Sequence, residues 1–218
     1  MNKQRIKILK EHEHITFGPY VAQMKADQNF CQRLLETGKT LTRPYNDYLI
    51  GQIEKELQFD LKKDLWIERE LETYTNTWID GYKRFSGDNS LNPLSKLDSL
   101  WINFQKAGEY NPTHIHTGCT LSFIIYLEVP QEMLDEWKVP LKTLGTSPGC
   151  TILTYGEDQN GVVTQRLIKP SKDILLMFPA SLRHAVPHFN SKNVTRTTVS
   201  GNISFLGNAP NVKPKQAK

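Results

Sequence analysis

The chain lacks the features that would mark it as a membrane, disulfide-rich or secreted protein. No window approaches the roughly 18 consecutive apolar residues of a membrane-spanning helix, and the first residues, MNKQRIKILKEHEH, carry charge where a signal peptide has an apolar core. The only cysteines are Cys31, Cys119 and Cys150, an odd number at wide spacings that fits neither a disulfide framework nor a zinc knuckle. We therefore expect a soluble, cytoplasmic protein with reduced thiols.

An excess of charge of one sign is also missing. The 27 Lys+Arg against 23 Asp+Glu give a net charge of +4, and several of the lysines lie at 209–218, a basic tail that we expect to be disordered. Charge alone therefore does not indicate a nucleic-acid partner. With only 13 Gly and 12 Pro among 218 residues the chain is not collagen-like or of low complexity, and 38% hydrophobic residues suffice for one core of ordinary size.

Before about residue 98 the pattern predicts one short strand followed by helices. Residues 5–10 alternate with period two, whereas apolar residues recur at helical spacing within 27–37, 45–57 and 60–82. A stretch dense in turn formers, SGDNSLNP at 86–93, separates this part from the rest of the chain. We expect residues 1–98 to pack on the same core as the following residues rather than to form a separate domain.

From residue 99 the pattern predicts strand after strand, with turn signals between them. The expected strands cover 100–106, 120–129, 151–155, 162–168, 173–178, 184–189 and 196–206. Short strands at this spacing are typical of a sandwich or a jelly roll. The fold class we expect from the pattern is mainly β with N-terminal helices, and the strands from residue 99 onward form either a sandwich or a jelly roll. The long break at 131–148 either pads the barrel or closes over a ligand.

Two pairs of histidines have the spacing that lets both side chains share one metal ion. Successive side chains on a strand alternate faces, so His114 and His116 point to the same side. His12 and His14 have the same spacing, but they lie among charged residues, where a solvated strand face explains them. A histidine pair alone is more often a polar patch than a metal site. What favours metal at the first pair is its place between a Gly- and Pro-bearing turn and the apolar strand LSFIIYL.

A third histidine also lies where an apolar strand meets a turn. His184 follows the apolar residues 173–179 through a short turn, and twelve positions later Arg196 begins the strand RTTVS. An imidazole binds divalent metals while remaining neutral near pH 7, and a guanidinium matches a carboxylate in two hydrogen bonds. Ser200 and Asn202 share the strand face of Arg196 and are expected to line the same pocket. The residues alone support a three-histidine metal site near an arginine, with an exposed strand charge as the alternative for that arginine.

In this order the motifs resemble those of the iron(II)- and 2-oxoglutarate-dependent oxygenases, and within them small prolyl-hydroxylase-like members of phages and marine bacteria. The family pattern is Asn-x-Tyr-x-x-Gly, then His-x-(Asp or Glu), then a distal His, then an Arg with a hydroxyl residue two positions later. The resemblance covers about 99–208. It implies an iron(II) ion held by His114, His116 and His184, and 2-oxoglutarate bound by Arg196 and Thr198 with help from Gln105 and Asn103.

The resemblance also implies a fold and a reaction. The fold is a double-stranded β-helix, the jelly roll of these oxygenases, buttressed by the N-terminal helices. The reaction consumes oxygen and 2-oxoglutarate, releases carbon dioxide and succinate, and hydroxylates a bound substrate. The substrate stays open among a protein side chain, a nucleobase and a small molecule, and the sequence gives no indication of the oligomeric state.

Two positions depart from the family pattern, and two other functions stay open. Gln105 replaces the usual Tyr, and His116 replaces the usual carboxylate, so the metal site has no negative charge and copper, nickel or zinc competes better with iron(II). The first alternative is a cupin-type metal-binding jelly roll whose chemistry is independent of an oxo acid. The second is a non-enzymatic structural or binding module, in which Cys119 is the nearest candidate for the fourth ligand of a structural zinc.

Overall fold

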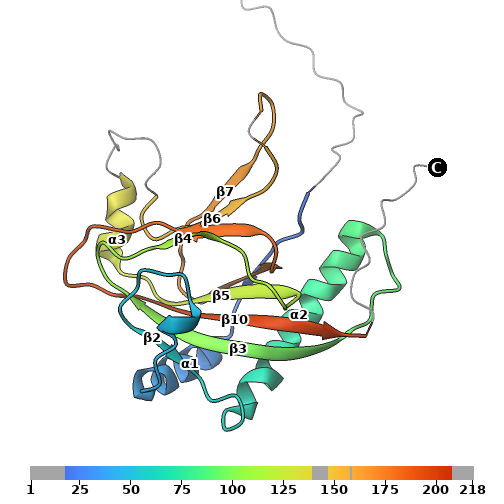
Figure 1. The fold of residues 1–218 in the computed structure, drawn as a ribbon, viewed down its shortest axis with the longest axis horizontal. Coiled ribbons are helices and arrows are strands. Elements are labelled where there is room, and N and C mark those ends of the chain that lie inside the picture. Colours follow the sequence, from blue (N-terminus) through green and yellow to red (C-terminus); the bar gives the residue numbers. More distant parts are fainter. Residues whose placement is uncertain (1–17, 139–146, 158, 208–218) are drawn as a thin grey trace, which may run out of the picture.

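Two antiparallel sheets form the centre of the computed structural model, which describes residues 18–138, 147–157 and 159–207 (Figure 1). The larger sheet has the strand order β1-β8-β5-β10-β3-β2, and the smaller has the order β4-β9-β6-β7. The strands of the larger sheet are β1 (Ala22–Lys25), β2 (Glu56–Gln58), β3 (Leu94–Gln105), β5 (Leu121–Glu128), β8 (Ile174–Pro179) and β10 (Arg196–Leu206). Those of the smaller sheet are β4 (Asn111–His114), β6 (Thr151–Thr154), β7 (Gln165–Ile168) and β9 (Arg183–Val186).

The helices lie mostly before the strands of the β half. They are α1 (Gln28–Thr40), α2 (Leu65–Ser86), the short α3 (Gln131–Asp135) and the 3₁₀ turns η1 (Asn46–Tyr48) and η2 (Glu136–Lys138). The Asp27 side chain caps α1 by accepting hydrogen bonds from two backbone N–H groups, and α2 ends at Gly87 in the left-handed conformation. Within the described ranges, no helix has the length and apolar character to cross a membrane.

The two long helices cover one face of the larger sheet (Figure 1). Side chains of α1 and α2, such as Leu34 and Trp78, share one buried cluster with side chains of β3, β5, β8 and β10. Along β5, Ile125 belongs to this cluster, whereas Tyr126 faces a second cluster with Leu153, on the side of the smaller sheet. Period-two alternation thus gives each central strand a face toward the helices and a face toward the smaller sheet. The expected mainly β fold, a jelly roll buttressed by N-terminal helices, is confirmed.

The helix predicted over 45–57 is wrong. This segment holds only η1 and then β2, and it folds back on itself through the Pro44–Leu57 bridge and a hydrogen bond from the Tyr45 N–H to the Glu56 carbonyl. β2 pairs with β3, placing Glu56 opposite Asn103. Pairing with a neighbouring strand has therefore overridden an apolar spacing that also fits a helix.

Other boundaries differ by a few residues. The helix expected at 60–82 is α2, shifted toward the C-terminus. The strand expected at 162–168 is limited to β7, and β3 begins six residues earlier than expected. Strands β1 and β4 were not expected. The strand predicted at 5–10 and the basic tail at 209–218 lie outside the described residues.

The described part of the 131–148 segment pads the barrel. Met133 of α3 is fully buried, and its sulfur approaches Gly149 so closely that a Cβ there would lie 2.5 Å from it. The Glu136 carboxylate accepts hydrogen bonds from the backbone N–H groups of Asn190 and Ser191, which ties η2 to the loop before β10. Residues 139–146 lie outside the described structure.

The contact of α1 with β3 gives a prediction about stability. A Cβ at Gly38 would lie 2.3 Å from Cδ1 of the buried Ile102, so Gly38→Ala overpacks this contact. We expect the variant to lose about 1–3 kcal/mol of unfolding free energy in urea titrations, although alanine alone favours a helix by about 1 kcal/mol. Adding Ile102→Val removes Cδ1 and should make the double variant more stable than the sum of the two single changes. A Gly38→Ala variant as stable as the parent would contradict this packing.

Candidate metal centre and pocket

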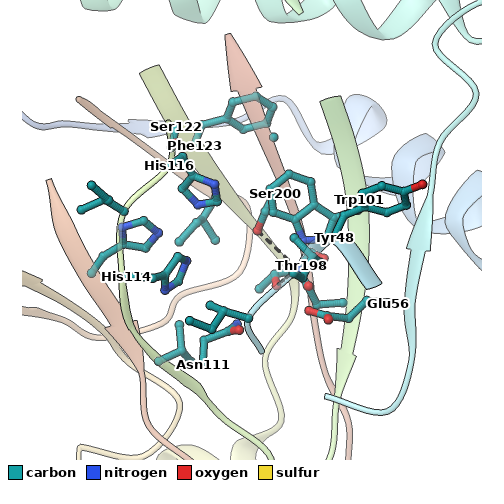
Figure 2. Close-up of a pocket in the computed structure, with 18 of the residues that line it drawn as sticks. Tyr48, Glu56, Trp101, Asn111, His114, His116, Ser122, Phe123, Thr198 and Ser200 are labelled. Carbon is teal, nitrogen blue, oxygen red and sulfur yellow. Dashed lines mark hydrogen bonds between the residues drawn. The ribbon is translucent and has the colours of Figure 1, made fainter. Parts of the chain in front are cut away.

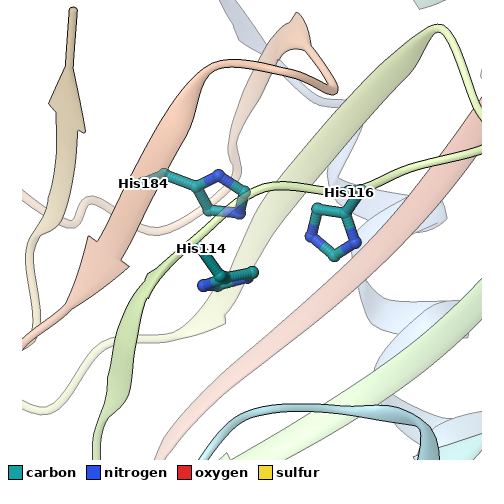
Figure 3. Close-up of side chains that lie close together, drawn as sticks. All are labelled: His114, His116 and His184. Carbon is teal, nitrogen blue, oxygen red and sulfur yellow. The ribbon is translucent and has the colours of Figure 1, made fainter.

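Three histidines come together in the interior of the jelly roll (Figure 3). His114 at the end of β4 lies directly opposite His184 of β9, and the His116 backbone N–H donates to the Ala180 carbonyl at 2.9 Å. The ring centroids are 4.2 Å apart for His114 and His184, 5.1 Å for His114 and His116, and 5.2 Å for His116 and His184. One nitrogen of each ring lies within 4.8 Å of the others. The structure thus gathers the three histidines that the sequence predicts.

Backbone carbonyls fix the orientation of two of these rings. His114 Nδ1 lies 2.7 Å from the Pro112 carbonyl oxygen, and His184 Nδ1 lies 2.9 Å from the Leu182 carbonyl oxygen. Since a carbonyl only accepts hydrogen bonds, each Nδ1 carries the proton and each Nε2 offers a lone pair. A metal-binding histidine is commonly held in this way. His116 has no such carbonyl partner, and its Nδ1 lies 3.5 Å from the Asn202 amide nitrogen.

Burial keeps two of the rings neutral. Burial, with a smaller contribution from His114, lowers the pKa of His116 to about 4. Burial and then the same neighbour lower the pKa of His184 to about 3, although the hydrogen bond to Leu182 acts in the opposite direction. A neutral imidazole is the form that binds a metal ion.

The donor set fits a divalent transition metal. Two imidazole nitrogens bound to one ion at about 2.1 Å lie at most about 4.2 Å apart. Side-chain movements of about half an ångström therefore suffice to bring nitrogens within the observed 4.8 Å onto one ion. Three imidazoles on one side leave further coordination positions open for small ligands.

The triad opens onto a cavity of about 180 Å³ between the two sheets (Figure 2). A water molecule occupies about 30 Å³ of liquid, so the cavity has room for a small organic acid. Its lining includes three residues of β10 on one strand face, Arg196, Thr198 and Ser200, as the period-two pattern predicts. Asn202, which was expected to line the same pocket, is not among the lining residues. Asn103 of β3 also lines it, opposite Thr198 in the strand register.

Arg196 is a buried cation with an incomplete set of partners. Its side chain is 2% exposed, Nη1 donates to Gln105 Oε1 at 3.1 Å, and Cζ lies 5.1 Å from the centroid of the Tyr126 ring. Among the described residues, Nε and Nη2 have no hydrogen-bond partner, and no ion pair includes this guanidinium. A buried charge without a partner costs several kcal/mol (about 3–5). An anion bound in the cavity would remove this cost.

Gln105 and Asn103 are already engaged within the protein. The Gln105 amide nitrogen donates to the Glu109 carbonyl at 2.6 Å, and its oxygen accepts from Arg196. The Asn103 amide nitrogen lies 3.2 Å from Thr198 Oγ1 and 3.3 Å from Ser200 Oγ. These contacts support a role in holding Arg196 and Thr198 in place rather than direct contact with a bound acid.

Sequence reasoning missed several residues that line the cavity. Among them are Glu56, Tyr48, Asn111 and Trp101. Glu56 and Tyr48 fell within the helix wrongly predicted at 45–57. The alternation of buried Leu57 and Phe59 with Gln58 was the signal for a strand there. His188, the remaining histidine of the described chain, is not among the residues that line the cavity.

A comparison with protein-family models matches residues 99–202 to a family described as "Putative 2OG-Fe(II) oxygenase". The matched stretch contains the three histidines and Arg196. No curated protein matches the chain.

Solved structures share the fold at low sequence identity. A Pseudomonas putida prolyl-4-hydroxylase has a TM-score of 0.54 at 12% identity, covering 86% of this chain and 93% of its own. The viral collagen prolyl hydroxylase of Paramecium Bursaria Chlorella virus-1, solved as a 2OG complex, has a TM-score of 0.53 at 14% identity. The match covers 85% of this chain and 96% of the viral chain. An oxidoreductase of the 2OG-Fe(II) oxygenase family from Burkholderia pseudomallei has a TM-score of 0.52 at 12% identity, and the match covers 84% of this chain and 84% of that one. These likenesses show a common fold.

Cys119 does not belong to the histidine cluster, and this gives a prediction about thiol reactivity. Within the described part of the chain the metal-binding group contains the three histidines only. Burial raises the pKa of all three thiols, that of Cys31 to about 12 and that of Cys150 to about 11, but Cys119 is the one that is only partly buried and therefore accessible. We expect iodoacetamide at pH 8 to label Cys119 first, at the same rate with and without metal, as mass spectrometry of tryptic peptides would show. Protection of Cys119 by metal would instead support the structural zinc site.

Proposed function

Because the chain belongs, through residues 99–202, to the 2OG-Fe(II) oxygenase family, we propose that its three-histidine centre holds the iron and its buried arginine binds the 2-oxoglutarate. Enzymes of this family use iron(II) and 2-oxoglutarate. The iron, when bound, supplies oxidation by molecular oxygen, which converts 2-oxoglutarate to succinate and carbon dioxide and transfers one oxygen atom to the substrate. We propose hydroxylation of a carbon atom as the outcome.

His114, His116 and His184 are the proposed ligands. Two of the rings have the Nδ1 proton held by a backbone carbonyl, so that Nε2 is free to bind metal. His116 occupies the position at which the family usually has a carboxylate. The Asn202 amide nitrogen lies 3.5 Å from Nδ1 of this third ring, and the Asn202 amide oxygen accepts from Ser122.

The single observation that carries the cosubstrate assignment is Arg196, a buried cation with two unpaired nitrogens on a cavity shared with the histidines. A dicarboxylate with one end at the metal offers its far carboxylate to these nitrogens, in a bidentate arrangement that a guanidinium favours. Thr198 Oγ1, from the same strand face, is the second proposed donor. Gln105 and Asn103 act as positioning residues.

The same observation weakens the cupin alternative. Chemistry independent of an oxo acid does not need a buried guanidinium, and a structural module has no use for an unpaired one. The solved relatives include prolyl hydroxylases, but at 12–14% identity they leave the substrate of this chain open. A cytoplasmic location, the further part of our proposal, is supported by the free state of the three cysteines.

The ligand assignment predicts the effect of removing single imidazoles. His114→Ala, His116→Ala and His184→Ala should each weaken iron(II) binding by at least about 100-fold, because even the loss of an outer-shell partner costs up to that much. Metal analysis after anaerobic loading and desalting would measure this. His188→Ala is the matched control and should keep one ion per chain. Full metal content in the His184→Ala protein would contradict the assignment.

The cosubstrate assignment predicts opposite effects on binding and on stability at one residue. Arg196→Met removes the guanidinium but keeps the bulk, so 2-oxoglutarate should bind the metal-loaded protein at least about tenfold more weakly in calorimetry. The apoprotein should be as stable as the parent or more stable, since an unpaired buried charge is gone. Metal affinity should not change, and the exposed Arg183→Met should behave like the parent. Unchanged 2-oxoglutarate affinity would favour the cupin alternative.

The third histidine is tested by restoring the usual residue. His116→Asp adds a negative charge to the donor set and should shift metal preference from copper(II) toward iron(II), while decarboxylation of 2-oxoglutarate continues. Loading the protein from a mixture of the two metals, followed by metal analysis, gives the ratio of bound iron to bound copper. The same ratio in the variant and the parent would mean that His116 is not a ligand. Loss of folding would mean that it is a buried structural residue.

A further inference from the structure

A buried carboxylate lies in the same cavity, away from the histidines. Glu56 of β2 is 1% exposed and lines the cavity, and Oε2 has no hydrogen-bond partner in the described part of the chain. Figure 2 shows Glu56, Tyr48 and Trp101 at one end of the cavity and His114 at the other. An unpaired buried acceptor that faces a cavity is a group for a ligand to satisfy.

Nothing described in the protein neutralises Glu56. Burial, followed by repulsion from Glu109, raises the pKa of the Glu56 carboxyl to about 7, and no cation offsets these two causes. Lys55 lies over the Phe104 ring at 4.6 Å. Arg196 lines the same cavity, but among the described residues it forms no ion pair with Glu56, and its two unpaired nitrogens are assigned to the cosubstrate.

A second acceptor lies next to this carboxylate. β2 pairs with β3 so that Glu56 is directly opposite Asn103, and side chains in such pairs contact one another. The Asn103 amide nitrogen is directed to the Thr198 carbonyl and hydroxyl, which leaves Oδ1 buried without a partner among the described residues. A carboxylate and an amide oxygen side by side complement a group with several N–H donors.

Aromatic rings connect this end of the cavity to the surface and to the metal centre. Tyr48, which is 73% exposed, stacks on Tyr45 at 5.2 Å, and Tyr45 lies 5.5 Å from Trp101. Trp101 in turn lies 6.0 Å from His116. Ring faces attract cations, so the row offers a favourable entry path for a positively charged group.

From this arrangement we infer that Glu56, Asn103 and Trp101 form a recognition subsite for a cationic nitrogen of the substrate, an amine or a guanidine. The inference rests on the proposed function and names the substrate class of the same site. A nitrogen held at Glu56 would anchor the substrate at one end of the cavity and direct a neighbouring carbon toward the histidines. A proline residue within a peptide is uncharged and has no N–H, so this subsite separates the chain from prolyl hydroxylases in substrate.

The test uses two small probes of nearly equal shape. Methylguanidinium chloride carries the charge, and N-methylurea does not. Each is titrated at constant ionic strength into the full chain, and the Trp101 indole N–H resonance, assigned with Trp101→Phe, reports binding. At pH 8 we expect methylguanidinium to bind at least about tenfold more tightly than N-methylurea, as for a charge-assisted hydrogen bond.

Variants separate the carboxylate from its surroundings. Glu56→Gln should remove the preference for the cation, whereas Glu56→Asp should keep part of it. Glu54→Gln is the matched control, because Glu54 is exposed on the same segment and paired with Lys106. The preference should weaken from pH 8 to pH 6 in the parent, because the Glu56 carboxyl is protonated there, and stay flat in Glu56→Gln. Tyr48, His114, His116, His184 and Arg196 also line the cavity, and Glu109 acts on the Glu56 carboxyl by charge repulsion; the Glu56→Gln variant retains all of these groups.

The outcomes distinguish this inference from the proposed function. No preference in the parent, or an equal preference in Glu56→Gln, would overturn the subsite. Metal and 2-oxoglutarate affinities measured on the same samples should be unchanged by Glu56→Gln. If the parent binds neither metal nor 2-oxoglutarate, the proposed function fails, whatever the probes show at Glu56.

Discussion

The pairing of β10 with β3 on one side and β5 on the other determines which side chains face the interior of the jelly roll. Through this register Arg196 lies opposite Gln105, and Thr198 lies between Asn103 and Tyr126. The alternate residues of β10 face the helices, where Val199 joins the large apolar cluster. A slip of one residue would bury the cation under the helices and turn the apolar face into the cavity. The packing of α1 and α2 on the larger sheet therefore specifies the site as well as the fold.

Among the described residues, the interior holds polar groups of complementary character, each with at least one atom that lacks a hydrogen-bond partner or a metal ion. His116 and His184 are kept neutral by burial, with lone pairs available for a metal ion, while Arg196 keeps a charge with two free donors. Away from the histidines, Glu56 Oε2 and Asn103 Oδ1 are acceptors with no donor among the described residues, while the Asn103 amide nitrogen contacts Thr198 Oγ1. Each set costs stability in the free protein and is satisfied by a ligand of opposite character. We propose that the histidines and Arg196 bind an acid and that Glu56 and Asn103 bind a base.

Much of the β10 strand face and of the histidine cluster was predictable from the sequence, because both depend on local residue patterns. Alternation along 196–206 predicted the inward face of β10. The spacing of two predicted that His114 and His116 share one side of a strand, but β4 ends at His114, so His116 reaches the cluster from the segment that follows the strand. The approach of His184 depends on the pairing of β4 with β9, which the resemblance to known oxygenases implied and spacing alone did not. Glu56 was missed because its segment has an apolar spacing compatible with a helix. The short alternation of Leu57, Gln58 and Phe59 is the only local signal for a strand there, and the long-range pairing with β3 decides between the two patterns.

The central claim is that one ion at the three imidazoles and one dicarboxylate at Arg196 occupy the same cavity. An anaerobic crystal structure of the protein with iron(II) and 2-oxoglutarate tests this most directly. The account predicts iron bonded to nitrogens of His114, His116 and His184, with the far carboxylate of 2-oxoglutarate paired to the Arg196 guanidinium. Iron bound away from these histidines, or 2-oxoglutarate bound without contact to Arg196, would contradict it.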